Sequence, residues 1–138
     1  MYTLTVKELA NSGGTTPHAV RYYTRIGLLH PERNPDNGYR FYKYKEVDWL
    51  RFIRQAKRLG YTLSEIRDIM HDSDQGKSPC PRVRETLLQH IDENRRQLAE
   101  LMALQTRMEG ALKQWAEMPD DVPGEYSVCH LIESFTEE

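Results

Sequence analysis

The stretch from residue 16 to residue 44 constrains the fold of this chain most strongly. Thr16 predicts a helix N-cap, and Pro17 suits the first helical turn because its missing amide hydrogen costs nothing there. Gly27 predicts the end of that helix. An Asn-Gly turn then precedes the alternating aromatic run Tyr39–Tyr42, which predicts a short strand. A short basic helix followed by a basic, aromatic hairpin is the layout of a winged helix-turn-helix.

Charge is divided unevenly along the sequence, and the division supports a nucleic-acid partner. Residues 1–60 carry 11 Lys and Arg against 5 Asp and Glu, whereas residues 61–138 carry 8 against 16, for a net charge of −2. A basic half is expected of a surface that binds phosphates. The acidic half would repel DNA, so we expect it to point away. An uneven but merely solvated surface is the alternative.

Three motifs within about the first 70 residues resemble the DNA-binding half of the MerR-type transcriptional regulators. They are RYYTRIGLL, NGYRFY and KYKEVDWLRFIRQAKRLGYTLSEIRDIM. The resemblance implies a homodimer that binds double-stranded promoter DNA, bends and untwists it, and acts on RNA polymerase through the promoter. It also implies operator contacts for Arg21 and Tyr22 on the helix and for Tyr39 and Arg40 on the wing.

The predicted DNA-contacting set is wider than those four residues, because basic and hydroxyl-bearing side chains reach bases and phosphates. It comprises Thr16, His18, Arg21, Tyr22, Tyr39, Arg40, Tyr42 and Lys43. Tyr23 falls on the apolar side of the helix with Val20 and Ile26, so we assign it to the core.

Residues 80–115 predict one long helix with a heptad register. Its seam contains Leu98, Leu101 and Met108, with polar interruptions at Asn94 and Gln105. At 1.5 Å per residue this helix is roughly 50 Å long, too long to bury its apolar stripe against a head of about 70 residues. We therefore expect an antiparallel coiled coil with a second copy. A single amphipathic helix folded back on the head is the alternative.

These patterns predict a mainly α fold in four parts. The expected ranges are 1–72 for the winged helix-turn-helix domain, 73–79 for a linker, 80–116 for the dimerisation helix and 117–138 for an effector-binding loop and tail. No apolar run is long enough to cross a membrane, and the N-terminus does not read as a signal peptide, so we expect a cytoplasmic protein.

Two cysteines suggest an effector site. Cys80 stands at the start of the long helix, where the helix N-terminus favours thiolate, and Cys129 stands in the tail before His130. In metal-responsive MerR-type proteins, such a cysteine of one protomer meets the C-terminal loop of the other. The resemblance thus implies a thiophilic ion such as zinc, cadmium, lead or copper(I) at Cys80 and Cys129. His130 and a carboxylate such as Glu133 would complete a tetrahedron around zinc or a similar divalent ion, so we expect His130 to be a further ligand.

The cysteine pattern departs from that branch of the family at one point. The zinc-, lead- and mercury-type members have a further cysteine near the end of the long helix, where this chain has Trp115. Two thiolates suit a soft monovalent ion in a linear arrangement. Inert, buried thiols are the alternative for each cysteine.

Two other functions are alternatives to metal sensing. The first is the same DNA-binding dimer responding to an electrophile, an oxidant or an organic ligand, and the second is a coiled-coil adaptor. We expect no enzymatic activity, because the sequence has no nucleophile elbow, phosphate-cradling glycine loop or zinc-protease motif.

Overall fold

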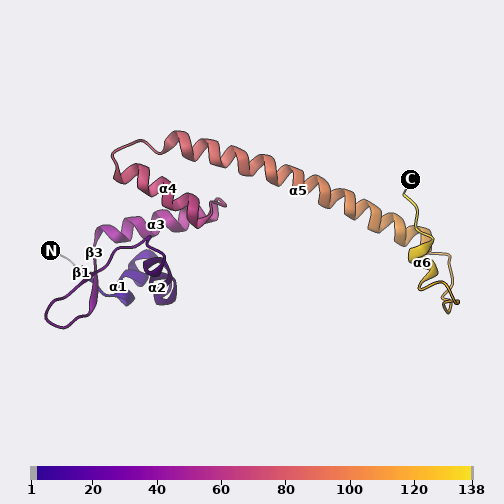
Figure 1. Cartoon of the computed structure of the whole chain (residues 1–138), viewed down its shortest axis with the longest axis horizontal. Helices are drawn as coiled ribbons and strands as arrows, with labels where there is room; N and C mark the ends of the chain where they lie inside the picture. The colour runs from indigo at the N-terminus through magenta and orange to yellow at the C-terminus, as the bar shows by residue number, and fades with distance from the viewer. Residues whose placement is uncertain (1–2, 138) are drawn as a thin grey trace. The chain divides into compact units, whose positions relative to one another are not determined.

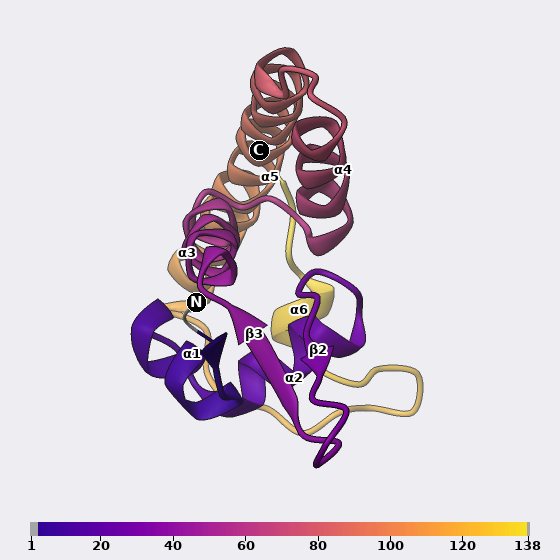
Figure 2. The same cartoon turned by 90° about the vertical axis from the view of Figure 1, so that its left-hand side faces the viewer.

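The computed structural model describes residues 3–137, and its contacts divide the chain into two compact units, Met1–Leu87 and Leu88–Glu138. Figure 1 and Figure 2 together label the elements. The first unit, called the head below, contains β1 (Thr3–Leu4), α1 (Val6–Gly13), α2 (Pro17–Arg25), β2 (Glu32–Arg33), β3 (Arg40–Lys43), α3 (Lys45–Arg58), α4 (Leu63–Asp74) and the start of α5 (Cys80–Trp115). The second contains the rest of α5 and α6 (His130–Glu133). The unit boundary lies inside α5, and the four predicted domain ranges stay predictions.

Local sequence determines where the head's helices begin. Thr5 and Glu8 form a capping box at α1, with hydrogen bonds of 3.1 and 3.0 Å, and Thr62 and Glu65 form the same box at α4. Thr16 accepts the Ala19 amide at 3.2 Å to cap α2. The predicted start of α2 is therefore confirmed.

The three strands form a small antiparallel sheet in the order β1-β3-β2, with β3 in the middle (Figure 2). Leu4 pairs with Tyr42, and Arg33 pairs with Arg40. The loop between β2 and β3 is held by side-chain caps, in which the amide of Tyr39 donates to Oδ1 of Asn37 at 2.9 Å. This hairpin is the predicted wing.

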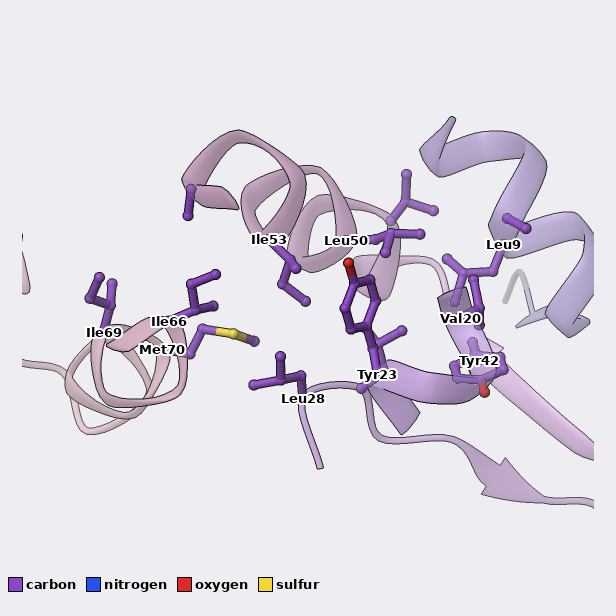
Figure 3. Packing of buried hydrophobic residues seen from close by; sticks show 14 of the residues in the cluster. Leu9, Val20, Tyr23, Leu28, Tyr42, Leu50, Ile53, Ile66, Ile69 and Met70 are labelled. Carbon is purple, nitrogen blue, oxygen red and sulfur yellow. The ribbon is translucent and has the colours of Figure 1, made fainter. Parts of the chain in front are cut away.

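The head's core lies where α1, α2, α3 and α4 meet (Figure 3). Tyr23 is 7% exposed and extends from α2 towards Leu50 and Ile53 of α3, as the sequence predicted. Close approach of α1 to α3 requires Gly13, since a Cβ there would lie 2.9 Å from Cγ of Leu50. The helix-turn-helix is therefore packed directly onto α3.

Among residues 3–137, one carboxyl side chain is buried with this core. Glu46, at the start of α3, is 2% exposed and accepts the amide of His30 at 3.3 Å through Oε1. Burial raises the pKa of the Glu46 carboxyl, and the His30 hydrogen bond opposes that rise. Among residues 3–137 no hydrogen-bond partner meets Oε2. Glu46 thus joins the loop after α2 to α3.

In the second unit, α5 presents an apolar stripe that its own chain leaves exposed. Leu98, Leu101, Met108 and Leu112 have exposed fractions of 59%, 62%, 57% and 69%. The tail turns back onto the other side of α5, where Nε2 of Gln114 donates to the Thr136 carbonyl at 2.9 Å. No helix in the described part of the chain has the length and apolar character to span a membrane.

Candidate DNA-binding surface and cysteine sites

Helix α2 separates its side chains into a core face and an outer face. Val20 and Tyr23 are buried, whereas His18, Arg21 and Tyr22 are exposed. The Arg25 guanidinium lies 5.4 Å from the centroid of the Tyr22 ring, which orients both groups on the outer face. The structure therefore groups a histidine, two arginines and a tyrosine on the face that a recognition helix would turn to the major groove.

The wing adds a second set of exposed side chains. Tyr39 is 75% exposed, Arg40 is exposed at the beginning of β3, and Nζ of Lys43 lies 3.1 Å from Oε1 of Glu32 across the sheet. Arg40 can reach a phosphate directly, whereas Lys43 shares its charge with an adjacent carboxylate.

Tyr42 requires a correction to the predicted DNA-contacting set. It is 0% exposed, and its hydroxyl is 2.6 Å from that of Thr24 on α2. The reason is strand geometry, because Tyr42 sits in the central strand and pairs with Leu4, so its ring enters the core. Tyr42 anchors the wing to the hydrophobic core and does not belong to the wing's outer surface.

Arg54 has a role that local sequence reasoning missed. Its Nη1 donates to the Gly13 carbonyl at 2.8 Å and so clamps the turn of the helix-turn-helix to α3. The two residues are 41 positions apart, which explains why no local pattern indicated the contact. This arginine and Arg51 and Arg58 line a polar groove of about 380 Å³ beside that turn.

The cysteines occupy two different local settings. Cys80 is exposed at the first position of α5, and its amide donates to Oγ of Ser78 at 3.3 Å. Cys129 is half-buried at the N-cap of α6, and its amide donates to Oε1 of Glu133 at 3.0 Å. The Glu133 carboxylate also accepts the amide of Val128, so it serves as a cap for the turn. Neither cysteine is in a disulfide.

The ring of His130 is oriented by the backbone of the tail. Its Nε2 lies 3.0 Å from the carbonyl oxygen of Pro119, which can only accept. In the neutral ring Nε2 therefore carries the proton, and Nδ1 keeps a lone pair available to a ligand. Within residues 3–137, a single chain assembles no cluster of three or more His, Cys, Asp or Glu side chains able to hold a metal.

Comparison with known proteins agrees with this architecture. The family model described as "MerR HTH family regulatory protein" matches residues 4–73, and the model "MerR, DNA binding" matches residues 47–111. An HTH-type transcriptional regulator of Synechocystis is 35% identical over 127 residues, covering 91% of this chain and 82% of that protein. This chain belongs to the MerR family. Its predicted resemblance and fold class are thus confirmed, and DNA-binding transcriptional regulation is its class of function.

Two further proteins extend the comparison over nearly the whole chain. The mercuric resistance operon regulatory protein of Bacillus cereus is 30% identical over 129 residues, covering 94% of each chain. The crystal structure of the regulator PbrR691 from Ralstonia metallidurans in complex with lead(II) has a TM-score of 0.74 at 24% identity, covering 96% of this chain and 99% of that one. The latter likeness concerns the fold, a winged helix-turn-helix followed by a long helix.

Proposed function

We propose that this MerR-family protein is a homodimer that binds double-stranded promoter DNA and distorts it in response to a thiophilic metal ion, acting on RNA polymerase through the promoter. One observation carries the metal-sensing part. Cys80 presents an exposed thiol at the first position of a 36-residue helix, in a chain that matches a mercuric resistance regulator along 94% of its length.

The DNA contacts in this proposal come from the outer faces of α2 and the wing. Arg21 and Tyr22 are the base-reading and phosphate-binding pair of the helix, and Tyr39 and Arg40 are their counterparts on the wing. Thr16, His18 and Lys43 border this surface and add contacts to the backbone. Tyr42 is left out because it is buried.

The homodimer follows from the stripe on α5. Large apolar side chains such as Leu98 and Leu112 are more than half exposed at heptad spacing. A second copy supplies a surface of the same length and pattern. Two heads are then available for two half-sites on the DNA.

The donor atoms of the two cysteines suit a soft ion, although one chain does not assemble them. Cys80 presents its sulfur at the N-terminus of α5, and Cys129 is accompanied by His130, whose Nδ1 is free to bind. A bound ion would accept electron pairs from these thiolates of two protomers. Trp115 takes the position of the usual further cysteine, so the donor set suits two or three ligands, and Glu133 is already engaged with backbone amides.

Covalent sensing through Cys80 is the second candidate. Cys80 is exposed, and within the described residues of one chain no other ligating group joins it in a cluster. An electrophile or oxidant would need only this thiolate. In that case Cys129 and His130 would not matter for the response.

A titration of the reduced protein separates these candidates. Zinc, cadmium, lead, mercury(II) and copper(I) are added in turn, and thiolate charge-transfer absorbance is recorded. We expect binding that weakens as the pH falls, since ligation displaces thiol protons. Cys80→Ser and Cys129→Ser should each weaken it by at least about 100-fold, which exceeds the cost of losing an outer hydrogen-bond partner of a ligand. Ser134→Ala is the control.

The same titration can contradict the proposal. An unchanged response in Cys129→Ser, or no absorbance change with any of these ions, would remove the shared metal site. Loss of response in Cys80→Ser alone, together with a covalent mass increase after exposure to an oxidant, would favour the second candidate.

A further inference from the structure

We propose that Tyr61, Asp72 and Arg82 form a latch that fixes the first two turns of α5 to the head, so that Cys80 moves as part of the DNA-binding unit. The contacts that form the latch do not depend on the proposed function. The regulatory consequence rests on the proposed function, because it concerns how a signal at Cys80 reaches the DNA.

Tyr61 provides the first point of the latch. Its ring is 6% exposed in the turn between α3 and α4, and its hydroxyl donates to the Val83 carbonyl of α5 at 2.7 Å. A tyrosine hydroxyl is protonated at neutral pH and can donate, and burial raises its pKa further at Tyr61. A carbonyl inside an α-helix already accepts the amide four residues ahead, so α5 does not need this hydrogen bond to form. Its effect is to join α5 to the α3–α4 turn.

Asp72 of α4 and Arg82 of α5 provide the second point and join the two helices that the loop connects. Nε of Arg82 donates to Oδ2 of Asp72 at 2.7 Å, and Nη2 reaches Oδ1 at 3.4 Å. Arg82 holds the pKa of the Asp72 carboxyl below its usual range, and the Asp72 side chain is only 16% exposed. A two-point guanidinium–carboxylate pair fixes orientation as well as distance.

Apolar contacts continue the same attachment. Val83 and Leu87 pack against the hydrophobic core of the head, and the compact unit that contains the head extends to Leu87. The polar segment 75–79 therefore does not act as a free joint, because the chain on both of its sides is held to the same body. The structure assigns any pivot to a position after Leu87.

In sequence, Cys80 lies inside both attachments, after Tyr61 and Asp72 and before Arg82 and Val83. A ligand that pulls on the Cys80 thiolate would therefore move α4 and the α3–α4 turn, and the loop would not absorb the displacement. The latch residues are positioning residues for the response. Their loss should uncouple the Cys80 site from the head while leaving the DNA-contacting residues and both thiols unchanged.

Hydrogen exchange of the full-length protein without any added ligand tests the latch itself. In the wild type, peptides covering residues 80–87 should exchange as slowly as those of α4. In Tyr61→Phe and Asp72→Asn they should exchange about tenfold faster, while peptides covering residues 95–105 keep their rates. Tyr126→Phe, which removes a hydroxyl from a tyrosine that is 93% exposed, and Asp74→Asn on the same helix as Asp72 are matched controls. Unchanged exchange at residues 80–87 in both latch variants would overturn the proposal.

A second measurement tests the coupling, with mercury(II) as the probe and a duplex selected by the protein from a random library as the DNA. Tyr61→Phe and Asp72→Asn should each bind mercury(II), and separately the duplex, with an affinity within about twofold of wild type. The factor by which mercury(II) changes the DNA affinity should, however, be at least about tenfold smaller in these variants than in the wild type. The charge-reversed pair D72R/R82D should recover it. Wild-type coupling in both single variants would overturn the regulatory role. If mercury(II) changes nothing in the wild type, metal sensing by mercury(II) fails, and the exchange result decides the latch.

Discussion

At the scale of single residues, burial separates side chains that look alike in the sequence. Tyr39 and Tyr42 lie three positions apart in one aromatic run, but Tyr39 is 75% exposed and Tyr42 is fully buried against Thr24. The strand places them differently because Tyr42 pairs with Leu4 in the centre of the sheet. A hydroxyl that is engaged inside the core cannot serve a phosphate outside it.

Two glycines in helices give opposite predictions for the same substitution. Gly13→Ala should destabilise the head by about 1–3 kcal/mol, because the added methyl group would meet the Leu50 side chain. Gly110→Ala should stabilise α5 by about 0.5–1 kcal/mol, since nothing lies within 4 Å of a Cβ there and alanine favours the helix. Thermal unfolding of both variants beside wild type checks the pair. Equal shifts in one direction would contradict the packing of α1 on α3.

At the scale of elements, the residues proposed to contact DNA lie on a helix and a hairpin that are both fixed to the core of the head. Helix α2 is fixed by its Thr16 cap, by Tyr23 in the core and by the Arg54 clamp on the preceding turn. The wing is attached through β3, which pairs with strands on both sides. Exposed side chains on both elements therefore stand on fixed backbones, a requirement for reading DNA in a defined register.

Substitutions on these two elements should have different signatures in DNA binding. Arg21→Ala should weaken binding to a selected operator by about 1–3 kcal/mol and relax sequence discrimination, because an arginine on the recognition helix can fork onto a base. Arg40→Ala should weaken binding evenly across sequences and lower the salt dependence, as expected for a phosphate contact. Mobility shifts at several salt concentrations measure both, with Arg95→Ala on α5 as control. Wild-type affinity in both variants would show that this surface does not contact DNA.

At the scale of the whole molecule, a single chain leaves too much apolar surface exposed on α5. The stripe from Ile91 to Leu112 covers most of the helix in the second unit, and the tail packs elsewhere, through Gln114 and Thr136. Isolated exposed leucines are ordinary, but a row of large apolar side chains at heptad spacing requires a partner surface. The same long helix in a second copy meets that requirement.

Leu98→Glu should dissociate the dimer, because a carboxylate would be placed in the apolar seam. Operator binding should fall with it, since the two heads would no longer be held at the spacing of two half-sites. Light scattering gives the mass, and Ala99→Glu, one position outside the seam, should leave it unchanged. A monomeric wild type, or a dimeric Leu98→Glu protein that binds DNA normally, would refute this assembly.

Local sequence alone determined much of the secondary structure of this protein. Capping residues such as Thr5, Thr16 and Thr62 specify helix starts by hydrogen bonds that span only three residues. The apolar periodicity of α5 can likewise be recognised in the sequence alone. The resemblance of the motifs to the MerR family added the class of function, which the comparisons confirmed.

Only the tertiary structure decided the remaining points, because each depends on groups distant in sequence. The burial of Tyr42, the clamp of Arg54 on Gly13 and the attachment of Val83 to Tyr61 join residues 18, 41 and 22 positions apart. No periodicity or cap records such contacts, since they arise when separate elements pack on one core. For the same reason, no local pattern indicates that the packing of the head continues into α5 as far as Leu87, and the four domain ranges stay predictions.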